Sequence, residues 1–273
     1  MKNISCGITG GTGVLGRKII EKLPFKFIKF TGNLANTDEI KKWVNENHFD
    51  IFLHLGAVVS TKDVSNNYIY AKKVNILGTY KLFDFLSKKK NKPEWVFFSS
   101  SSHVYGERKY QIKISENSKT KPSSQYGKTK LAAERKIINL KNKINICTGR
   151  IFSFTSNDQK IPFIIPVLKK KIFLRKKLIY LENLNHHRDF ISLNDIIKSI
   201  YILFKKKKIG IYNIGSSYPI NLLDFANYLA KKNKKKIKSK KNSPTFLISN
   251  NSKLRKLGIK VKKLSFRDIA YAK

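Results

Sequence analysis

A tyrosine and a lysine stand four residues apart in the segment SSQYGKTK at residues 123–130, and four serines follow one another at residues 99–102. Residues at this spacing are neighbours on one face of a helix, so Lys130 can lie beside Tyr126. A tyrosine has a pKa near ~10 and is a poor base at neutral pH unless a cation stabilises its phenolate. The pair could therefore exchange protons with a substrate, although Lys130 alone would be interpreted as surface charge.

A glycine-rich segment, TGGTGVLG at residues 9–16, spaces Gly10, Gly13 and Gly16 three residues apart. Such a loop lets the backbone approach a pyrophosphate, and the helix that follows adds N–H groups and its positive dipole end. A glycine turn without a ligand is the alternative interpretation. The loop follows the first predicted strand and begins a predicted helix, and this context favours a dinucleotide site.

Strands and helices that alternate along the chain must position these groups. Apolar runs predict strands over residues 3–9, 25–30, 50–57, 94–102 and 144–152, with helices between them. Thr37, followed by two acids, is expected to cap a helix, and residues 66–90 are expected to form one long helix. The pattern predicts an α/β fold, a Rossmann-like doubly wound parallel sheet over residues 1–150. A smaller substrate-binding region is expected over residues 151–273, partly interleaved with the core.

The chain is strongly basic, with 57 Lys+Arg against 17 Asp+Glu and a formal net charge of +40. Polyanion binding is one interpretation, because lysines that neutralise phosphates release counterions. The lysines cluster, however, at predicted helix ends and loops such as 205–208 and 231–241, and many asparagines and isoleucines accompany them. We therefore interpret the charge as solvated surface and expect no specific nucleic acid partner.

The remaining composition points to a cytoplasmic protein. Cys6 and Cys147 lie in strand-like runs without metal-ligand spacing, so reduced thiols and no metal are expected. No run approaches the ~18 apolar residues of a membrane helix, and the N-terminus shows no secretory signal. The adjacent His186 and His187 would face opposite sides of a strand, and we interpret them as surface or loop residues.

Several segments, in order over residues 3–258, together resemble the extended short-chain dehydrogenase/reductases, the family of NAD-dependent epimerases, dehydratases and reductases of nucleotide sugars. TGGTGVLG resembles the cofactor loop of that family, and FDIFLHLGAVVS resembles its third coenzyme strand. VNILGTYKL resembles the Asn-x-x-Gly-Thr helix, FFSSSSHVYGE the catalytic-serine segment, and QYGKTKLAAE the Tyr-x-x-x-Lys helix. RDFISLNDI resembles the Arg-Asp-Phe/Tyr-Ile segment at the nucleotide-sugar site.

The resemblance implies roles for individual residues. Tyr126 would exchange a proton with a sugar hydroxyl or carbonyl, Ser101 would orient that oxygen, and Lys130 would lower the pKa of the tyrosine. The cofactor would be NAD or NADP, which the sequence does not resolve, and it would contact Gly10, Thr12, Gly13, Val14, Leu15, Gly16, Asn33, Leu34, Leu55, Gly56, Ala57, Asn75, Ser99, Tyr126, Lys130 and Ile151. The substrate, a nucleotide-diphosphate sugar, would contact Ser101, His103, Tyr126, Ser153 and Arg188.

The chain also departs from the family pattern. The segment FKFIKFTGN lacks the acid that would bind the ribose 2′-OH of NAD. Lys26, Lys29 or Arg17 could instead meet a 2′-phosphate, with surface exposure as the simpler interpretation. Asn33 replaces the aspartate that faces the adenine, SFTSN at residues 153–157 replaces Asn-x-Tyr-Gly-Pro, and the second and third strands are expected to be fused or trimmed.

These departures favour a reductase. The dehydratases of the family carry an Asp-Glu pair after the catalytic hydroxyl residue, where this chain has Ser102 and His103. Reduction of a 4-keto sugar is therefore the first interpretation, and C4 epimerisation is the second. A non-catalytic cofactor-binding protein is the third, and the Ser101, Tyr126 and Lys130 set argues against it. The oligomeric state is open, with a homodimer as one candidate.

Overall fold

A six-stranded parallel sheet forms the centre of the computed structural model, which describes residues 4–173, 177–240 and 242–272. The predicted strand at 3–9 is observed from Ser5, and residue 3 lies outside the described range. The strand order is β10-β6-β4-β3-β1-β2, a doubly wound arrangement. The strands are β1 (Ser5–Thr9), β2 (Lys26–Lys29), β3 (Ile51–His54), β4 (Trp95–Ser101), β6 (Ile146–Ile151) and β10 (Gly210–Ile214).

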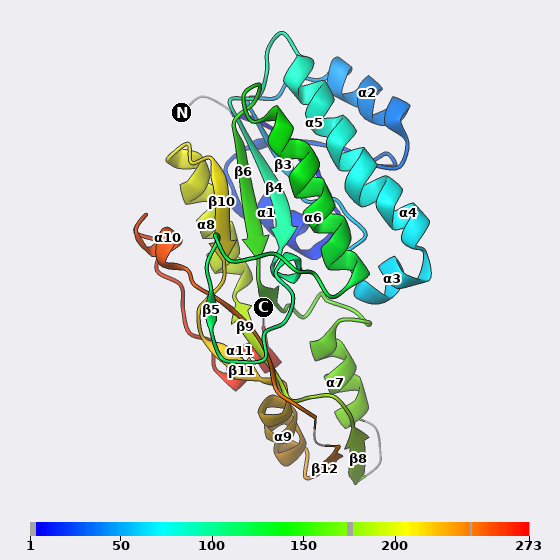
Figure 1. Ribbon diagram of the computed structural model, residues 1–273, viewed down its shortest axis with the longest axis vertical. Helices are drawn as coiled ribbons and strands as arrows, with labels where there is room; N and C mark the ends of the chain where they lie inside the picture. The colour runs from blue at the N-terminus through cyan, green and yellow to red at the C-terminus, as the bar shows by residue number, and fades with distance from the viewer. Residues whose placement is uncertain (1–3, 174–176, 241, 273) are drawn as a thin grey trace.

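Each strand of the sheet alternates its side chains between two hydrophobic cores. Ile51 and Leu53 of β3 pack toward α1 (Val14–Lys22) and α8 (Leu193–Lys205). Phe52 packs on the opposite face, toward α2 (Thr37–Glu46), α5 (Thr79–Lys88) and α6 (Gln125–Ile137). In Figure 1, α5 and α6 cross the face nearer the viewer. Strands that are apolar on both faces are typical of a buried parallel sheet, so the predicted fold class is confirmed.

Three local predictions need correction. The N-cap of α2 is Asn36, whose Oδ1 accepts hydrogen bonds from the N–H groups of Asp38 and Glu39, and Thr37 is the first helical residue. The long helix expected over 66–90 runs without interruption from Tyr68 to Lys88, as α4 (Tyr68–Lys72), a π-helical turn (Lys73–Gly78) and α5, and a separate short helix, α3 (Thr61–Asn66), precedes it. The second and third strands are separate: β2 forms one edge of the sheet, and α2 connects it to β3.

The start of the long helix and its π-helical turn have local causes. Asn67 lies outside helical geometry and is the N-cap of α4. Its side chain accepts a hydrogen bond from the N–H of Tyr70. The π-helical turn that follows carries Asn75, whose amide binds the backbone of Val58. Such turns inside helices commonly occur at functional sites.

A smaller region lies at the carboxyl ends of the sheet strands, in the lower half of Figure 1. Its core joins α7 (Ile164–Phe173), α9 (Leu222–Lys232) and α11 (Phe266–Ala270) to its strands. β9 (His186–Ile191) pairs with β11 (Pro219–Asn221), β13 (Thr245–Ser249) and β7 (Ser153–Phe154), and β8 (Leu178–Leu181) pairs with β12 (Lys236–Ser239).

The two regions exchange segments. β5 (Lys113–Ile114), from the first half of the chain, pairs with β13, whereas α8, β10 and α10 (Ser252–Arg255), from the second half, pack with the large sheet. The two regions are therefore not separated in space at residue 150. The assignment of cofactor binding to residues 1–150 and of substrate binding to residues 151–273 stays a prediction. Among the described residues, no helix is long and apolar enough to span a membrane.

Candidate active site

The loop between β1 and α1 forms a cradle that side chains would fill. Gly10 has a φ of 72°, which L-residues rarely adopt, and a Cβ placed on it would lie 2.6 Å from the backbone nitrogen of Gly56. A Cβ on Gly16 would collide with the carbonyl oxygen of Gly10. These glycines therefore let the loop pack closely against the Gly56 backbone and against its own first turn, and α1 begins directly after it. Free N–H groups and the helix dipole at the start of α1 favour a pyrophosphate.

A cleft of about 610 Å³ opens beside the cradle. Some predicted cofactor contacts line it, namely Gly10, Thr12, Asn33, Leu34, Gly56 and Ala57. Other lining residues were missed in the sequence, namely Phe30, Thr31, Gly32, Glu39, Val58, Tyr70 and Val74. The segment 30–32 follows β2 directly and could have been found, because ligands of open α/β sheets bind at the carboxyl ends of strands. Nothing in the sequence marks Tyr70.

Ser101, Tyr126 and Lys130 lie together at the carboxyl end of β4. Ser101 ends that strand, and the other two lie in the first half of α6, whose N-cap Ser124 accepts a hydrogen bond from the N–H of Gly127. The Ser101 hydroxyl lies near enough to the Tyr126 side chain to lower the pKa of the phenol. The Lys130 ammonium lies 4.8 Å from the centre of the Phe98 ring of β4.

Burial controls the protonation of this cluster. It raises the pKa of Tyr126 to about 12, and the Ser101 hydroxyl acts in the opposite direction. Burial lowers the pKa of Lys130 to about 8, against the negative charge of Glu134, which raises it. At neutral pH the tyrosine is thus a neutral proton donor beside a mostly protonated lysine. We predicted that Lys130 lowers the pKa of Tyr126; burial dominates instead, so that role stays a prediction.

A buried histidine fixes the strand ends beneath the cleft. His54 Nδ1 lies 2.6 Å from Thr9 Oγ1, and its Nε2 lies 2.9 Å from Thr79 Oγ1. Thr9 Oγ1 also accepts a hydrogen bond from the N–H of Gly56. Burial lowers the pKa of His54 to about 3, and the charge of Lys130 acts in the same direction. A neutral imidazole therefore connects the glycine-loop strand to α5.

Asn75 connects the cleft to the helix that carries Tyr126. Its Oδ1 accepts a hydrogen bond of 2.8 Å from the N–H of Val58, which lines the cleft. Its Nδ2 donates to the carbonyl of Val58 at 3.0 Å and to Thr129 Oγ1 at 3.1 Å. Thr129 directly precedes Lys130 on α6, so both amide atoms of Asn75 hold the cleft wall against this helix.

A buried ion pair supports the same helix from behind. Glu134 of α6 accepts hydrogen bonds from Arg150 Nε at 3.0 Å and Nη2 at 2.6 Å, and also from the Ser100 hydroxyl. The guanidinium lies 4.7 Å from the centre of the Tyr105 ring. This bidentate pair joins α6 to β4 and β6, so it fixes the height of Lys130 relative to the strand ends. Sequence reasoning did not find it.

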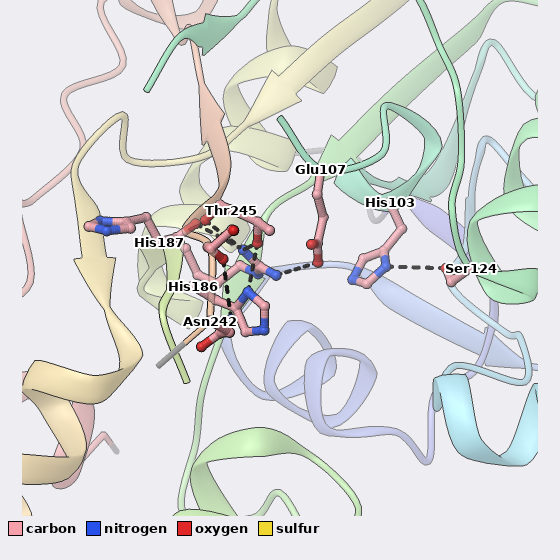
Figure 2. A network of polar contacts seen from close by, with 9 residues as sticks. His103, Glu107, Ser124, His186, His187, Asn242 and Thr245 are labelled. Carbon is pink, nitrogen blue, oxygen red and sulfur yellow. Dashed lines mark hydrogen bonds and ion pairs between the residues drawn. The ribbon is translucent and has the colours of Figure 1, made fainter. Parts of the chain in front are cut away.

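His103 lies in the turn that directly follows β4 of the large sheet, and Arg188 comes from β9 of the smaller region. The His103 ring lies edge-on to Tyr126, with ring centres 5.6 Å apart, and its Nδ1 is 3.4 Å from Ser124 Oγ. Arg188 forms an ion pair with Glu107 and contacts Thr245. Figure 2 shows the Glu107 carboxylate directed toward its partner and His103 directed toward Ser124. Burial lowers the pKa of His103, and the charge of Arg188 lowers it further.

The adjacent histidines leave β9 on opposite sides, as predicted (Figure 2). His186 Nδ1 lies 2.7 Å from Thr245 Oγ1, and His187 stacks on Phe246 with ring centres 4.5 Å apart. Both lie in a strand and not in a loop, and both are half-buried because β9 is paired on each side, so only the surface part of their interpretation holds, in part. Within residues 4–173, 177–240 and 242–272, no cluster of His, Cys, Asp and Glu could hold a metal ion.

The other predicted contacts lie around the cleft but do not line it. Gly13, Val14, Leu15 and Gly16 form the loop end and the start of α1, Leu55 follows β3, Ser99 lies in β4, Ile151 ends β6, and Ser153 starts β7. Their contacts with a cofactor or substrate stay predictions.

A doubly wound parallel sheet with a glycine cradle and a cleft at the strand ends defines a dinucleotide-binding class of α/β protein. A family model described as GDP-mannose 4,6 dehydratase matches residues 15–270. The chain belongs to this family of extended short-chain dehydrogenase/reductases.

Curated relatives in this family differ in their reactions. The GDP-6-deoxy-D-talose 4-dehydrogenase of Aggregatibacter actinomycetemcomitans is 28% identical over 207 residues, which cover 73% of this chain and 69% of that protein. The dTDP-D-glucose 4,6-dehydratase of Dictyostelium discoideum is 26% identical over 221 residues, which cover 76% of this chain and 50% of that protein. This chain thus spans about half the length of the dehydratase.

Solved structures share the whole fold. UDP-glucose 4-epimerase of Thermus thermophilus, in complex with NAD, has a TM-score of 0.85 at 17% identity, over 98% of this chain and 97% of that one. RMD from Pseudomonas aeruginosa, in complex with NADPH, has a TM-score of 0.84 at 19% identity, with the same coverage of both chains. At these identities the likeness concerns the fold.

Proposed function

We propose that this chain is a cytoplasmic NAD(P)-dependent oxidoreductase that reduces a nucleotide-activated 4-keto sugar. The observation that carries the proposal is the cluster of Ser101, Tyr126 and Lys130 at the carboxyl end of β4, beside a glycine cradle that a pyrophosphate fits. When bound, the nicotinamide dinucleotide supplies the hydride. Ser101, Tyr126 and Lys130 would orient the substrate carbonyl and move the proton to its oxygen.

Tyr126 acts as the proton donor. Its hydroxyl is neutral at physiological pH because burial raises its pKa, so it can protonate the oxygen of a carbonyl that is being reduced. Ser101, whose hydroxyl acts on the pKa of Tyr126, holds the same substrate oxygen. Lys130 supplies a positive charge beside them and is held by Phe98 and by the charge of Glu134. Proton donation leaves a phenolate on Tyr126, which the positive charge of Lys130 would stabilise until a proton returns from the solvent.

The proton carriers of a dehydratase are missing. Elimination of water from a hexose needs an acid for the leaving hydroxyl and a base for the neighbouring carbon. Ser102 follows Ser101 and cannot serve as an acid at neutral pH. His103 comes next, and burial and the charge of Arg188 keep its ring neutral, so it could fill only the role of base. Hydride transfer at C4 needs neither group.

A relative supports redox chemistry at C4. The Aggregatibacter relative, a GDP-6-deoxy-D-talose 4-dehydrogenase, is named for C4 oxidation of a 6-deoxyhexose bound to GDP. Reduction of a 4-keto-6-deoxy sugar nucleotide is the reverse of that class of reaction. The substrate diphosphate would meet Arg188 at the far end of the site, with His103 near the sugar.

The test is to offer the protein GDP- or dTDP-4-keto-6-deoxyhexose together with NADPH or NADH. We expect loss of the reduced nicotinamide absorbance and a sugar product heavier by two hydrogens. GDP-mannose and dTDP-glucose, supplied with NAD or NADP, should not lose water. Formation of the dehydrated product at enzymatic rates would refute the assignment.

C4 epimerisation is the second candidate, since it uses the same Ser101, Tyr126 and Lys130 set and is the reaction named for the Thermus neighbour. An epimerase interconverts UDP-glucose and UDP-galactose without net consumption of cofactor. Incubation with UDP-glucose and separation of the two sugars therefore distinguishes it from the reductase. Sedimentation of the same sample tests the homodimer.

A further inference from the structure

The lysine at the end of β2 lies along the glycine-rich loop. Cγ and Cδ of Lys29 are 3.6 Å from the position that a Cβ on Gly11 would occupy. β2 pairs with β1 in parallel, and this pairing continues one residue further, because the N–H of Phe30 donates to the carbonyl of Ile8. Lys29 is therefore fixed at the strand end that adjoins the cradle.

The side chains at this strand end point to alternate sides. Phe30 packs against Trp43, with ring centres 5.1 Å apart. Lys29, one residue before Phe30, therefore extends to the side of the glycine loop. Thr31 is exposed and lines the cleft. In the described parts of the chain, no hydrogen bond or ion pair engages the side chain of Lys29 or Thr31.

The other charged groups at this end of the cleft already have partners. The carboxylate of Glu39 accepts hydrogen bonds from the N–H of Asn33 at 2.7 Å and from Asn36 Nδ2 at 2.7 Å. Arg17 donates to the carbonyl of Thr12 and forms an ion pair of 3.5 Å with Asp158. Glu39 thus serves the loop before α2, and Lys29 is left as the charge beside the loop that a ligand can use.

We infer that Lys29 and Thr31 bind the 2′-phosphate of the adenosine ribose and that the chain selects NADP(H) over NAD(H). The inference rests on the proposed function. In dinucleotide-binding folds an acid at the end of the second strand accepts the ribose 2′-OH of NAD, and a basic side chain near it accommodates the 2′-phosphate of NADP. Residues 29–32 here contain no acid, and an ammonium and a hydroxyl can both donate to a phosphate.

The experiment measures binding without turnover. Calorimetric titration with 2′,5′-ADP and with 5′-AMP isolates the contribution of the 2′-phosphate. We expect 2′,5′-ADP to bind about 10- to 100-fold more tightly, the range of a hydrogen bond to a charged group. Lys29→Gln should bring the two affinities close together, and Thr31→Ala should narrow the gap less.

Lys26→Gln is the matched control, because Lys26 is exposed on the same strand but pairs with Ser5, at the opposite end from the loop. It should leave the ratio unchanged. Equal binding of the two probes to the wild type, or a ratio that Lys29→Gln does not alter, overturns the inference and leaves the oxidoreductase assignment intact.

A second titration separates the two proposals. NADPH and NADH are added to the wild type and to Lys29→Glu, and cofactor fluorescence is followed. NADPH should bind more tightly to the wild type, and the variant should favour NADH because its carboxylate can accept from the 2′-OH. Failure of both dinucleotides to bind the folded wild type overturns the proposed function as well.

Discussion

Backbone shape forms one end of the candidate site, and a buried carboxylate forms the other. At the glycine end, residues 9–16 act through a φ of 72° at Gly10 and the absence of side chains. At the arginine end, which comprises β9, the loop at residues 215–217 and β13, Asp189 is fully buried and accepts hydrogen bonds from both N–H and Oγ of Ser216 and Ser249 and from the N–H of Ser217.

This difference has a consequence for stability. The glycine cradle takes its shape from one short segment and its contacts with Gly56 and His54, so changes in the smaller region should affect it little. The arginine end joins three segments through one charge, so loss of that charge should release all three. Arg188 precedes Asp189 on β9, and its position therefore depends on the carboxylate beside it. The two ends should respond differently to substitution.

Tyr126→Phe should have the largest effect, and it should leave both ends able to bind. The variant lacks the proton donor, so turnover should fall by ~10²–10⁴-fold, the usual contribution of general acid catalysis. Cofactor affinity should stay within about threefold of the wild type, a change of well under ~1 kcal/mol. Steady-state kinetics with a 4-keto sugar nucleotide and titration with the cofactor measure the two quantities.

Tyr70→Phe is the control for this variant. Tyr70 also lines the cleft, and its hydroxyl donates a hydrogen bond to Asn33 Oδ1 at 3.2 Å. Neither residue belongs to the cluster of Ser101, Tyr126 and Lys130. Tyr70→Phe should affect cofactor affinity slightly and leave turnover near that of the wild type. Equal losses in the two variants, or no loss in Tyr126→Phe, would contradict the catalytic assignment.

Asp189→Asn should disrupt the arginine end alone. The amide keeps the size of the carboxylate but turns one acceptor into a donor that faces N–H and O–H groups. The free energy of unfolding should fall by about 3 kcal/mol or more, since hydrogen bonds to a buried charge are among the strong ones. Urea unfolding measures the loss.

Binding data then decide whether the ends are independent. The folded fraction of Asp189→Asn should keep its cofactor affinity and lose affinity for the nucleotide sugar. Asp224→Asn is the control, because that carboxylate is exposed at the start of α9 and should cost less than ~1 kcal/mol. If Asp189→Asn lost affinity for both the cofactor and the nucleotide sugar, the two ends would form one unit.

The sequence predicts the glycine end better than the arginine end, because the glycine end is formed by one short segment and the arginine end by segments far apart in the chain. A glycine loop and a Tyr-Lys spacing act within one turn of chain, so local rules identify them. The ion pair between Glu107 and Arg188 joins residues 81 apart, and the Glu134–Arg150 pair joins an α-helix to a strand. Both depend on tertiary packing that no local pattern records.

The same limit explains the errors inside the first half of the chain. The pattern over residues 66–90 is helical, but the side chain of Asn75 must reach Val58 and Thr129, and a π-helical turn provides that reach. The acid-free end of β2 was visible in the sequence. That Lys29, and not Lys26 or Arg17, lies along the loop required the structure.

His54 should make the glycine end sensitive to acid. Burial lowers its pKa from 6.5 to about 3, so below pH 6.5 the unfolded chain binds a proton that the folded chain does not. Stability contributed by the neutral ring is therefore full above pH 6.5 and is lost as the pH falls toward 3. Between pH 7 and pH 5 this amounts to about 2 kcal/mol.

Urea unfolding at pH 7 and pH 5 measures this loss in the free energy of unfolding. His54→Gln can still bond to Thr9 or Thr79 but does not titrate, so its loss between the two pH values should be smaller by about 2 kcal/mol. His48→Gln is the control, because His48 is exposed. An equal acid loss in the wild type and in His54→Gln would contradict the link between His54 and the glycine end.

Glu107→Gln should have the smallest effect and act only at the arginine end. Glu107 comes from the large-sheet half of the chain, and its side chain is 38% exposed, whereas the Arg188 side chain is 14% exposed. Half-exposed ion pairs contribute little to stability, so the free energy of unfolding should change by less than ~1 kcal/mol. The removed charge also competes with a substrate diphosphate for Arg188, so the KM for the nucleotide sugar should fall a few-fold.

Glu94→Gln controls for the loss of one surface charge, since Glu94 forms an exposed ion pair with Lys207 away from the site. It should change neither KM nor cofactor affinity. Arg188 keeps its contacts with Thr245, with the carbonyl of His187 and with the neighbouring strand after Glu107→Gln. The guanidinium therefore keeps its position, and only the carboxylate that competes with the substrate diphosphate is lost. A KM that rises in Glu107→Gln would instead mean that the carboxylate orients Arg188 for the substrate, and the arginine end would then depend on a residue from the other half of the chain.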